Sequence, residues 1–139
     1  MIKSFVFENY KSFEKAVLNL ESITSLIGTN SSGKSNAIEG IQILSEAATG
    51  LDLSVILDGT RNNASHIRGG SSSCCRFRKA SFKLGCLVNL DENHDLYYFI
   101  RISTNKRVWV EEEALYKVLN GNLNLGEGEK IFKTKKANK

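Results

Sequence analysis

The chain has 139 residues, of which 41% are hydrophobic and 24% are charged, as expected for one soluble globular domain. No apolar run approaches the roughly 20 residues that span a membrane. Charges are spread through the N-terminus, which excludes a signal peptide, so we expect a cytoplasmic protein without a membrane partner. The three cysteines lack Cys-x-x-Cys spacing, which argues against a zinc site or a disulfide framework.

Positive charge is concentrated in the second half of the chain. The net charge is −1 over residues 1–70 and +5 over residues 71–139. A basic region is compatible with nucleic-acid binding. Solvated strand faces followed by a lysine-rich tail would give the same distribution, and both interpretations stay open.

The N-terminal residues alternate in a β-like way. Residues 2–8 and 14–20 are rich in β-forming side chains, and the polar segment 9–13 (NYKSF) separates them, which predicts a hairpin. The apolar residues 23–27 predict a third strand.

Residues 28–35 read GTNSSGKS and fit the phosphate-binding pattern G-x-x-x-x-G-K-[ST]. In this pattern Gly28 permits a tight turn, and Gly33 lets the backbone approach the phosphates. Lys34 reaches the β- and γ-phosphates, and the Ser35 hydroxyl is a ligand for Mg²⁺.

The rest of this loop supplies backbone and polar side chains for the same purpose. Backbone N–H groups of residues 30–34 form a concavity suited to phosphate oxygens. An apolar repeat predicts a helix over residues 34–48, whose N-terminus adds its dipole. The predicted phosphate-contacting residues are therefore Gly28, Thr29, Asn30, Ser31, Ser32, Gly33, Lys34, Ser35 and Asn36.

The remaining chain divides by composition. Residues 51–73 form a Gly-, Ser- and Asn-rich connection, in which the pattern at 53–57 does not decide between helix and strand. Residues 74–120 predict an antiparallel β-meander, and 121–139 predict a basic, flexible tail. We expect these segments and residues 1–50 to form one partial domain.

The NYKSF turn, the GTNSSGKSN loop and the antiparallel meander together resemble the N-terminal part of ABC-type ATPase heads of the SMC/RecF group. The similarity extends to OLD-like AAA family ATPases of prokaryotic DNA-repair and phage-defence systems. Many of those proteins have glycine where this chain has Ser31.

The resemblance implies an α/β P-loop NTPase N-lobe with a mixed β-sheet, one P-loop helix and an antiparallel β-subdomain. It implies ATP and Mg²⁺ as cofactors, Lys34 as the catalytic lysine, and nucleotide contacts from Lys11 and Ser12. The alternative for this turn is that its aromatic residues pack the hairpin while Lys11 is solvated. A second ATPase head is the implied partner, with nucleic acid and an effector protein as further candidates.

The catalytic second half of such a head is not evident in these residues. Hydrolysis requires a Walker-B aspartate after four apolar residues, followed by a glutamate. Asp58 follows only three apolar residues and precedes Gly59, and Gln42 is the only glutamine. No LSGG-like signature occurs. We therefore expect an N-terminal portion that ends before Walker B and does not hydrolyse ATP by itself.

Three functions follow from these observations. The leading one is ATP binding as part of an ABC/SMC-like head. The second is a nucleotide- or partner-binding module that never hydrolyses. A P-loop kinase or GTPase is disfavoured, because Val108 stands where the guanine-binding pattern needs an aspartate. A basic stretch with aromatics at residues 76–83 is predicted to be a half-buried strand more readily than a nucleic-acid surface.

Overall fold

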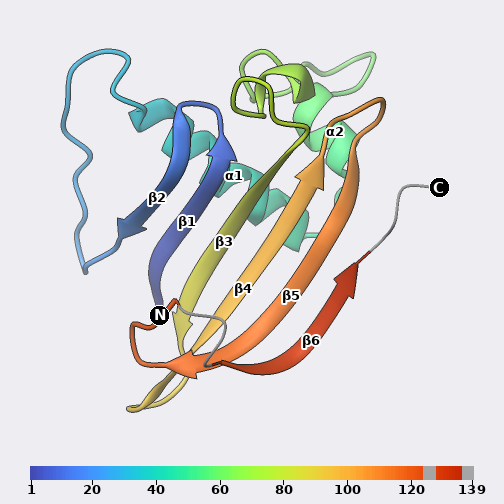
Figure 1. The fold of residues 1–139 in the computed structure, drawn as a ribbon. Coiled ribbons are helices and arrows are strands. Elements are labelled where there is room, and N and C mark those ends of the chain that lie inside the picture. The colour runs from blue at the N-terminus through green and yellow to red at the C-terminus, as the bar shows by residue number, and fades with distance from the viewer. Residues whose placement is uncertain (124–127, 136–139) are drawn as a thin grey trace.

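The computed structural model describes residues 1–123 and 128–135 and contains a six-stranded sheet in the order β2-β1-β3-β4-β5-β6 (Figure 1). Every pair of neighbouring strands is antiparallel. The strands are β1 Ile2–Tyr10, β2 Phe13–Asn19, β3 Ser81–Asn89, β4 His94–Ser103, β5 Trp109–Leu119 and β6 Glu129–Lys135.

The predicted hairpin and meander are both present and share one sheet. β1 pairs with β2 on one side and with β3 on the other, so the N-terminal hairpin extends the meander. The expectation of a mixed sheet is wrong for the described residues. Residues 23–27 form no strand, and Ile23 and Ile27 are almost fully exposed. A strand needs a hydrogen-bonding neighbour, and none of the described strands pairs with this segment.

Two helices cover one face of the sheet (Figure 1). α1, Lys34–Ala48, matches the predicted helix. α2, Leu53–Asp58, shows that residues 53–57, for which the pattern did not decide between helix and strand, are helical. Gly40 lets α1 approach β1 closely, because a Cβ atom there would lie 2.7 Å from Cε1 of Phe7. This contact sets how closely the middle of α1 packs on β1.

The core lies between these helices and the sheet. It includes large side chains with almost no exposure, namely Phe7, Tyr10, Ile43, Leu57, Phe82, Leu84 and Ile102. Alternation along the strands sends other side chains to the opposite face, where Val6, Phe99 and Tyr116 belong to a second cluster. The sheet is therefore apolar on both faces.

A row of ion pairs crosses the sheet beside the second cluster. Glu8 pairs with Lys83 and Arg101, and Glu112 pairs with Arg101 and Lys133. Three basic side chains of the C-terminal half, Lys83, Arg101 and Lys133, are thus balanced by carboxylates within the sheet.

The expected flexible tail is wrong for residues 129–135, which form β6 and pair with β5. Register with β5 gives these residues backbone partners, which composition alone did not indicate. The remaining residues of that segment, 124–127 and 136–139, lie outside the described residues. Among the described residues, no helix is long and apolar enough to cross a membrane.

Candidate phosphate-binding site

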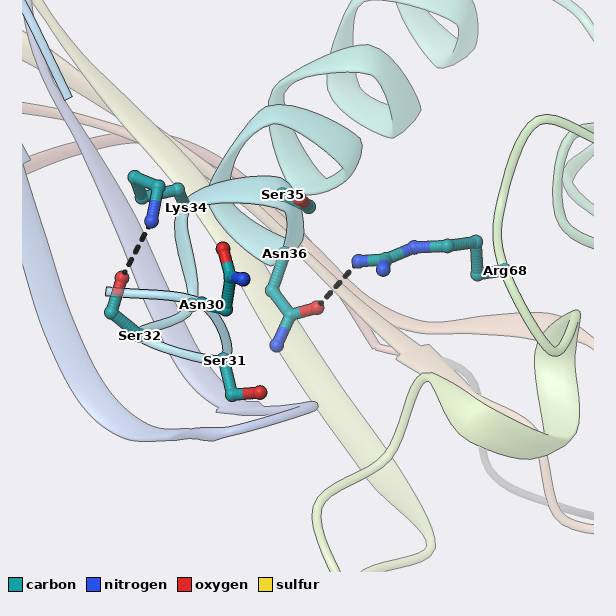
Figure 2. A pocket seen from close by; sticks show the side chains of 8 residues that line it. Asn30, Ser31, Ser32, Lys34, Ser35, Asn36 and Arg68 are labelled. Atoms are coloured by element: carbon teal, nitrogen blue, oxygen red, sulfur yellow. Dashed lines mark hydrogen bonds between the residues drawn. The ribbon is translucent and has the colours of Figure 1, made fainter. Parts of the chain in front are cut away.

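The predicted phosphate loop lies at the N-terminus of α1 and lines a polar cavity of about 470 Å³ (Figure 2). Its lining consists of the consecutive residues 30–36 together with Arg68 from the connection after α2. Gly28 and Thr29 do not line the cavity. The structure thus brings together seven of the nine predicted loop residues and adds one that the motif does not contain.

The loop ends in the uncapped N-terminus of α1, which borders this cavity. Gly33 is the N-cap of α1 with φ +94°, and no side chain caps the helix there. Unpaired N–H groups of a first helical turn, with the helix dipole behind them, favour an anion. A Cβ atom at position 33 would lie 3.0 Å from the Phe13 ring, so the hairpin turn also requires glycine here.

Ser31 adopts φ +70°, which is in the left-handed region. An L-residue with a side chain is strained in this region, whereas glycine is not. Ser31 therefore occupies a position that glycine would fill without strain.

Lys34 turns its ammonium group toward its own loop. Nζ donates to the carbonyl oxygens of Gly28 and Thr29, both at 2.6 Å, and to Oγ of Ser32 at 3.1 Å. No described carboxylate forms an ion pair with it. Its positive charge is therefore held beside the cavity by neutral groups and is available to an anionic ligand.

A chain of hydrogen bonds joins the hairpin turn, α1 and the connection. Asn36 Nδ2 donates to Ser12 Oγ at 2.9 Å, and Arg68 donates to Asn36 Oδ1 at 3.2 Å (Figure 2). Ser12 therefore lies next to the loop but does not line the cavity, and its nucleotide contact stays a prediction. Arg68 is 64% exposed in its side chain and borders the cavity as a second cation.

The surroundings of Lys11 differ from both alternatives predicted from the sequence, which were a nucleotide contact and a solvated side chain. Its ammonium binds the Glu39 carboxylate and donates to the Arg68 carbonyl oxygen at 3.1 Å. Its side chain is only 8% exposed, so Lys11 is not solvated, and it does not line the cavity. Tyr10 and Phe13 pack against Phe7, as the packing alternative expects.

Glu39 connects the two cations because its other carboxylate oxygen accepts from Arg68 Nε. Burial by itself raises the pKa of Glu39. The hydrogen bonds from Lys11 and Arg68, and their charges, outweigh burial and hold that pKa below its ordinary value of 4.5. The carboxylate is ionised at neutral pH and fixes both cations beside the loop.

Sequence reasoning missed Glu39 and Arg68. Glu39 carries a detectable signal, since it interrupts the buried face of α1 formed by Ala37, Gly40, Ile43 and Leu44. A carboxylate in such a place needs a charged partner. Arg68 has no comparable signal, because only the folded connection brings it to Asn36, 32 positions earlier.

The side chains that line the cavity provide few of the oxygen ligands that Mg²⁺ prefers. Ser35 lines the cavity and offers the hydroxyl oxygen that the motif uses as a metal ligand. Asp58 is engaged elsewhere, because Oδ1 accepts from the Ser71 N–H at 2.7 Å. No cluster of three metal-ligating side chains occurs among the described residues.

A loop with the phosphate-binding pattern thus lies at the start of α1, on the face of the sheet that the helices cover. A family model described as "AAA ATPase domain" matches residues 1–138, so the chain belongs to this ATPase family.

The structure is also similar to that of a protein described as the recombination mediator protein RecF in the RecFOR pathway, in a structure titled RecF-ATPrS. The two are 20% identical, with a TM-score of 0.49, over 88% of this chain and 27% of RecF. The chain thus spans about a quarter of that protein's length. No curated protein matches.

Proposed function

We propose that this chain binds ATP with Mg²⁺ as the N-terminal portion of an ABC/SMC-like ATPase head. The observation that carries the proposal is the polar cavity at the N-terminus of α1, bordered by residues 30–36, which include Lys34, and by Arg68. A triphosphate carries several negative charges, and this cavity offers N–H donors and positive charge with no described carboxylate in its lining.

Each residue has a distinct role in this proposal. Lys34 binds the β- and γ-phosphates, and its loop carbonyl partners release the ammonium when a stronger acceptor is present. Ser35 would supply a hydroxyl ligand for Mg²⁺, whose charge would offset that of the phosphates. Arg68 adds a charge at the cavity's edge, and Ser12 orients Asn36. Lys11 contacts a nucleotide only if its ammonium leaves Glu39.

Hydrolysis would use groups beyond these residues. The 139 residues contain no Walker-B pair and no signature motif, so a further segment or a second ATPase head would supply them. DNA repair or phage defence is the process that the family resemblance favours.

The second candidate function is a nucleotide- or partner-binding module without hydrolysis. The position of Asp58, the residue whose sequence context is most similar to a Walker-B aspartate, favours it. The Asp58 carboxylate accepts a hydrogen bond from the Ser71 N–H and does not line the cavity. Phosphate release from the pure chain, lost on Lys34→Ala, would exclude this candidate.

Isothermal titration calorimetry with Mg-ATP tests the binding proposal. Lys34→Ala should abolish measurable binding, because it removes the charge that contacts two phosphates. Lys130→Ala is a matched control, since it removes an exposed lysine from β6 and should bind as the unmodified chain does. Equal ATP affinity in the unmodified chain and Lys34→Ala would contradict the proposal.

A further inference from the structure

Residues 76–79, with the sequence RFRK, form an exposed turn that the nucleotide site does not use. The Lys79 N–H donates to the Arg76 carbonyl at 2.9 Å and closes the turn. Phe77 is 82% exposed, and the Arg78 guanidinium lies 5.1 Å from the centroid of its ring. The predicted half-buried strand is therefore wrong before residue 81, because Phe82 enters the core and Phe77 does not.

The turn is held firmly on the sheet. The Arg76 N–H donates to the Asn9 carbonyl at 2.8 Å, and the Lys11 N–H donates to the Cys74 carbonyl at 2.8 Å. Cys75 Sγ lies 3.2 Å from Thr104 Oγ1. The exposed aromatic ring is thus presented by an anchored backbone, which lowers the entropy cost of binding a ligand.

The charge around this turn is not balanced in the way it is on the sheet. No described carboxylate pairs with Arg78 or Lys79, and the one described carboxylate that pairs with Arg76 is the exposed Glu14, at 3.6 Å. The neighbouring turn adds the exposed Lys106 and Arg107, since the Thr104 N–H bonds to the Ala80 carbonyl. In contrast, Lys83 and Arg101 on the sheet pair with Glu8.

We propose that this surface, defined by residues 76–79 and 104–107, binds single-stranded nucleic acid. Phe77 offers an aromatic face on which an unpaired base stacks, and the surrounding cations contact the backbone phosphates. A hollow bordered by Phe77, Lys79 and Thr104 gives the strand a path between the two turns. In a duplex the base faces are already stacked on one another, so Phe77 favours a single strand. An acidic peptide would match the charge but would not need the exposed ring.

The proposal for this surface does not rest on ATP binding, although the surface contacts the hairpin turn beside the phosphate loop. Arg76 Nη1 donates to the Ser12 carbonyl at 3.2 Å, and Ser12 Oγ accepts from Asn36. The proposal is tested without nucleotide, and Lys34→Ala is included so that failure of ATP binding and failure of nucleic-acid binding are separable.

Fluorescence anisotropy with labelled oligo(dT), oligo(U) and a duplex of equal length tests the proposal. We expect both single strands to bind more tightly than the duplex, because stacking does not depend on the sugar. Phe77→Ala should weaken single-strand binding about tenfold, as expected for loss of one stacked base. Arg78→Ala and Lys79→Ala should each weaken it and reduce its dependence on salt.

Two controls separate this surface from general charge. Leu90→Ala removes an exposed apolar side chain at the other end of β3, and Lys130→Ala removes an exposed lysine from β6. Both should bind as the unmodified chain does, and so should Lys34→Ala. Three results would each overturn the proposal. They are a duplex affinity equal to the single-strand affinity, unchanged single-strand binding in Phe77→Ala, and displacement of the labelled single strand by polyglutamate as effective as displacement by unlabelled single strand. Absence of oligonucleotide binding would also overturn it.

Discussion

The sheet and the phosphate loop treat charged and polar groups in opposite ways. On the sheet, Glu8 and Glu112 are paired across neighbouring strands with lysine and arginine. At the loop, the Lys34 ammonium is held by neutral oxygens, and the first turn of α1 has no side-chain cap. Charge that is paired within the chain stabilises the fold, whereas charge without an opposite partner is available to a ligand.

Glu39 and its partners Lys11 and Arg68 share features of both regions. The Glu39 carboxylate pairs with Lys11 and Arg68 as the sheet carboxylates do, yet Arg68 also borders the cavity. The comparison therefore predicts that sheet variants change stability, loop variants change binding, and Glu39 variants change both.

The largest effect on stability is expected for Phe7→Ala. Phe7 is 1% exposed and contacts α1 and both aromatic residues of the turn. Loss of this ring from a packed core should reduce the free energy of unfolding by about 4 kcal/mol in urea denaturation. The same change at the exposed Phe77 should cost no more than about 0.5 kcal/mol. Similar costs at both positions would break the distinction between core and surface turn.

A smaller effect is expected for Glu39→Ala, which leaves the buried Lys11 ammonium without its partner. The cost in unfolding free energy should be about 3 kcal/mol, carried mainly by the Lys11 pair because Arg68 is solvated. We expect Mg-ATP affinity to fall as well, since Arg68 loses its anchor. Glu21→Gln, at an exposed position with no ion pair to another described residue, is the control.

The pH dependence of the stability of Glu39→Gln tests the ion pairs of Glu39 in a second way. Because the pKa of Glu39 is lowered in the folded chain, its ionised form stabilises the fold above the ordinary value of 4.5. The stability difference between the unmodified chain and Glu39→Gln should be complete at pH 7 and should shrink as the pH falls below 4.5. A difference that stays constant down to pH 3 would contradict the ion-pair assignment.

The smallest effect is expected for Ser31→Gly. Ser31 has φ +70°, so glycine should relieve strain and raise the free energy of unfolding by up to about 1 kcal/mol. Ser32→Gly is the matched control, because Ser32 has no positive φ and gains nothing from glycine. Thermal unfolding of the two variants provides the comparison. Equal shifts would show that the loop conformation is not strained at Ser31.

Local sequence patterns predict much of the fold. The hairpin, the meander and α1 follow from alternation, turn residues and an apolar helical repeat, and the loop follows from GTNSSGKS. Residues 23–27 have a strand-like composition but no described neighbour to pair with. The strand β6 exists because β5 gives it a partner. Both errors concern long-range pairing, which composition does not contain.

The site shows the same limit. The loop residues come together because they are consecutive, whereas Arg68 reaches the cavity only through the fold of the connection. Ser12 and Asn36 meet through the packing of Phe13 against Gly33, which no spacing rule gives. The motif therefore predicts the loop, and the tertiary structure supplies its neighbours.

The central claim is that the loop at the start of α1 binds the phosphates of ATP. Amide chemical shifts of the ¹⁵N-labelled chain, recorded during titration with Mg-ATP, test it most directly. We predict saturable shifts that are largest at residues 30–36, with smaller ones at Ser12 and Arg68, and none of these in Lys34→Ala. Unchanged loop amides at saturating Mg-ATP, or shifts confined to residues 76–79, would contradict the claim.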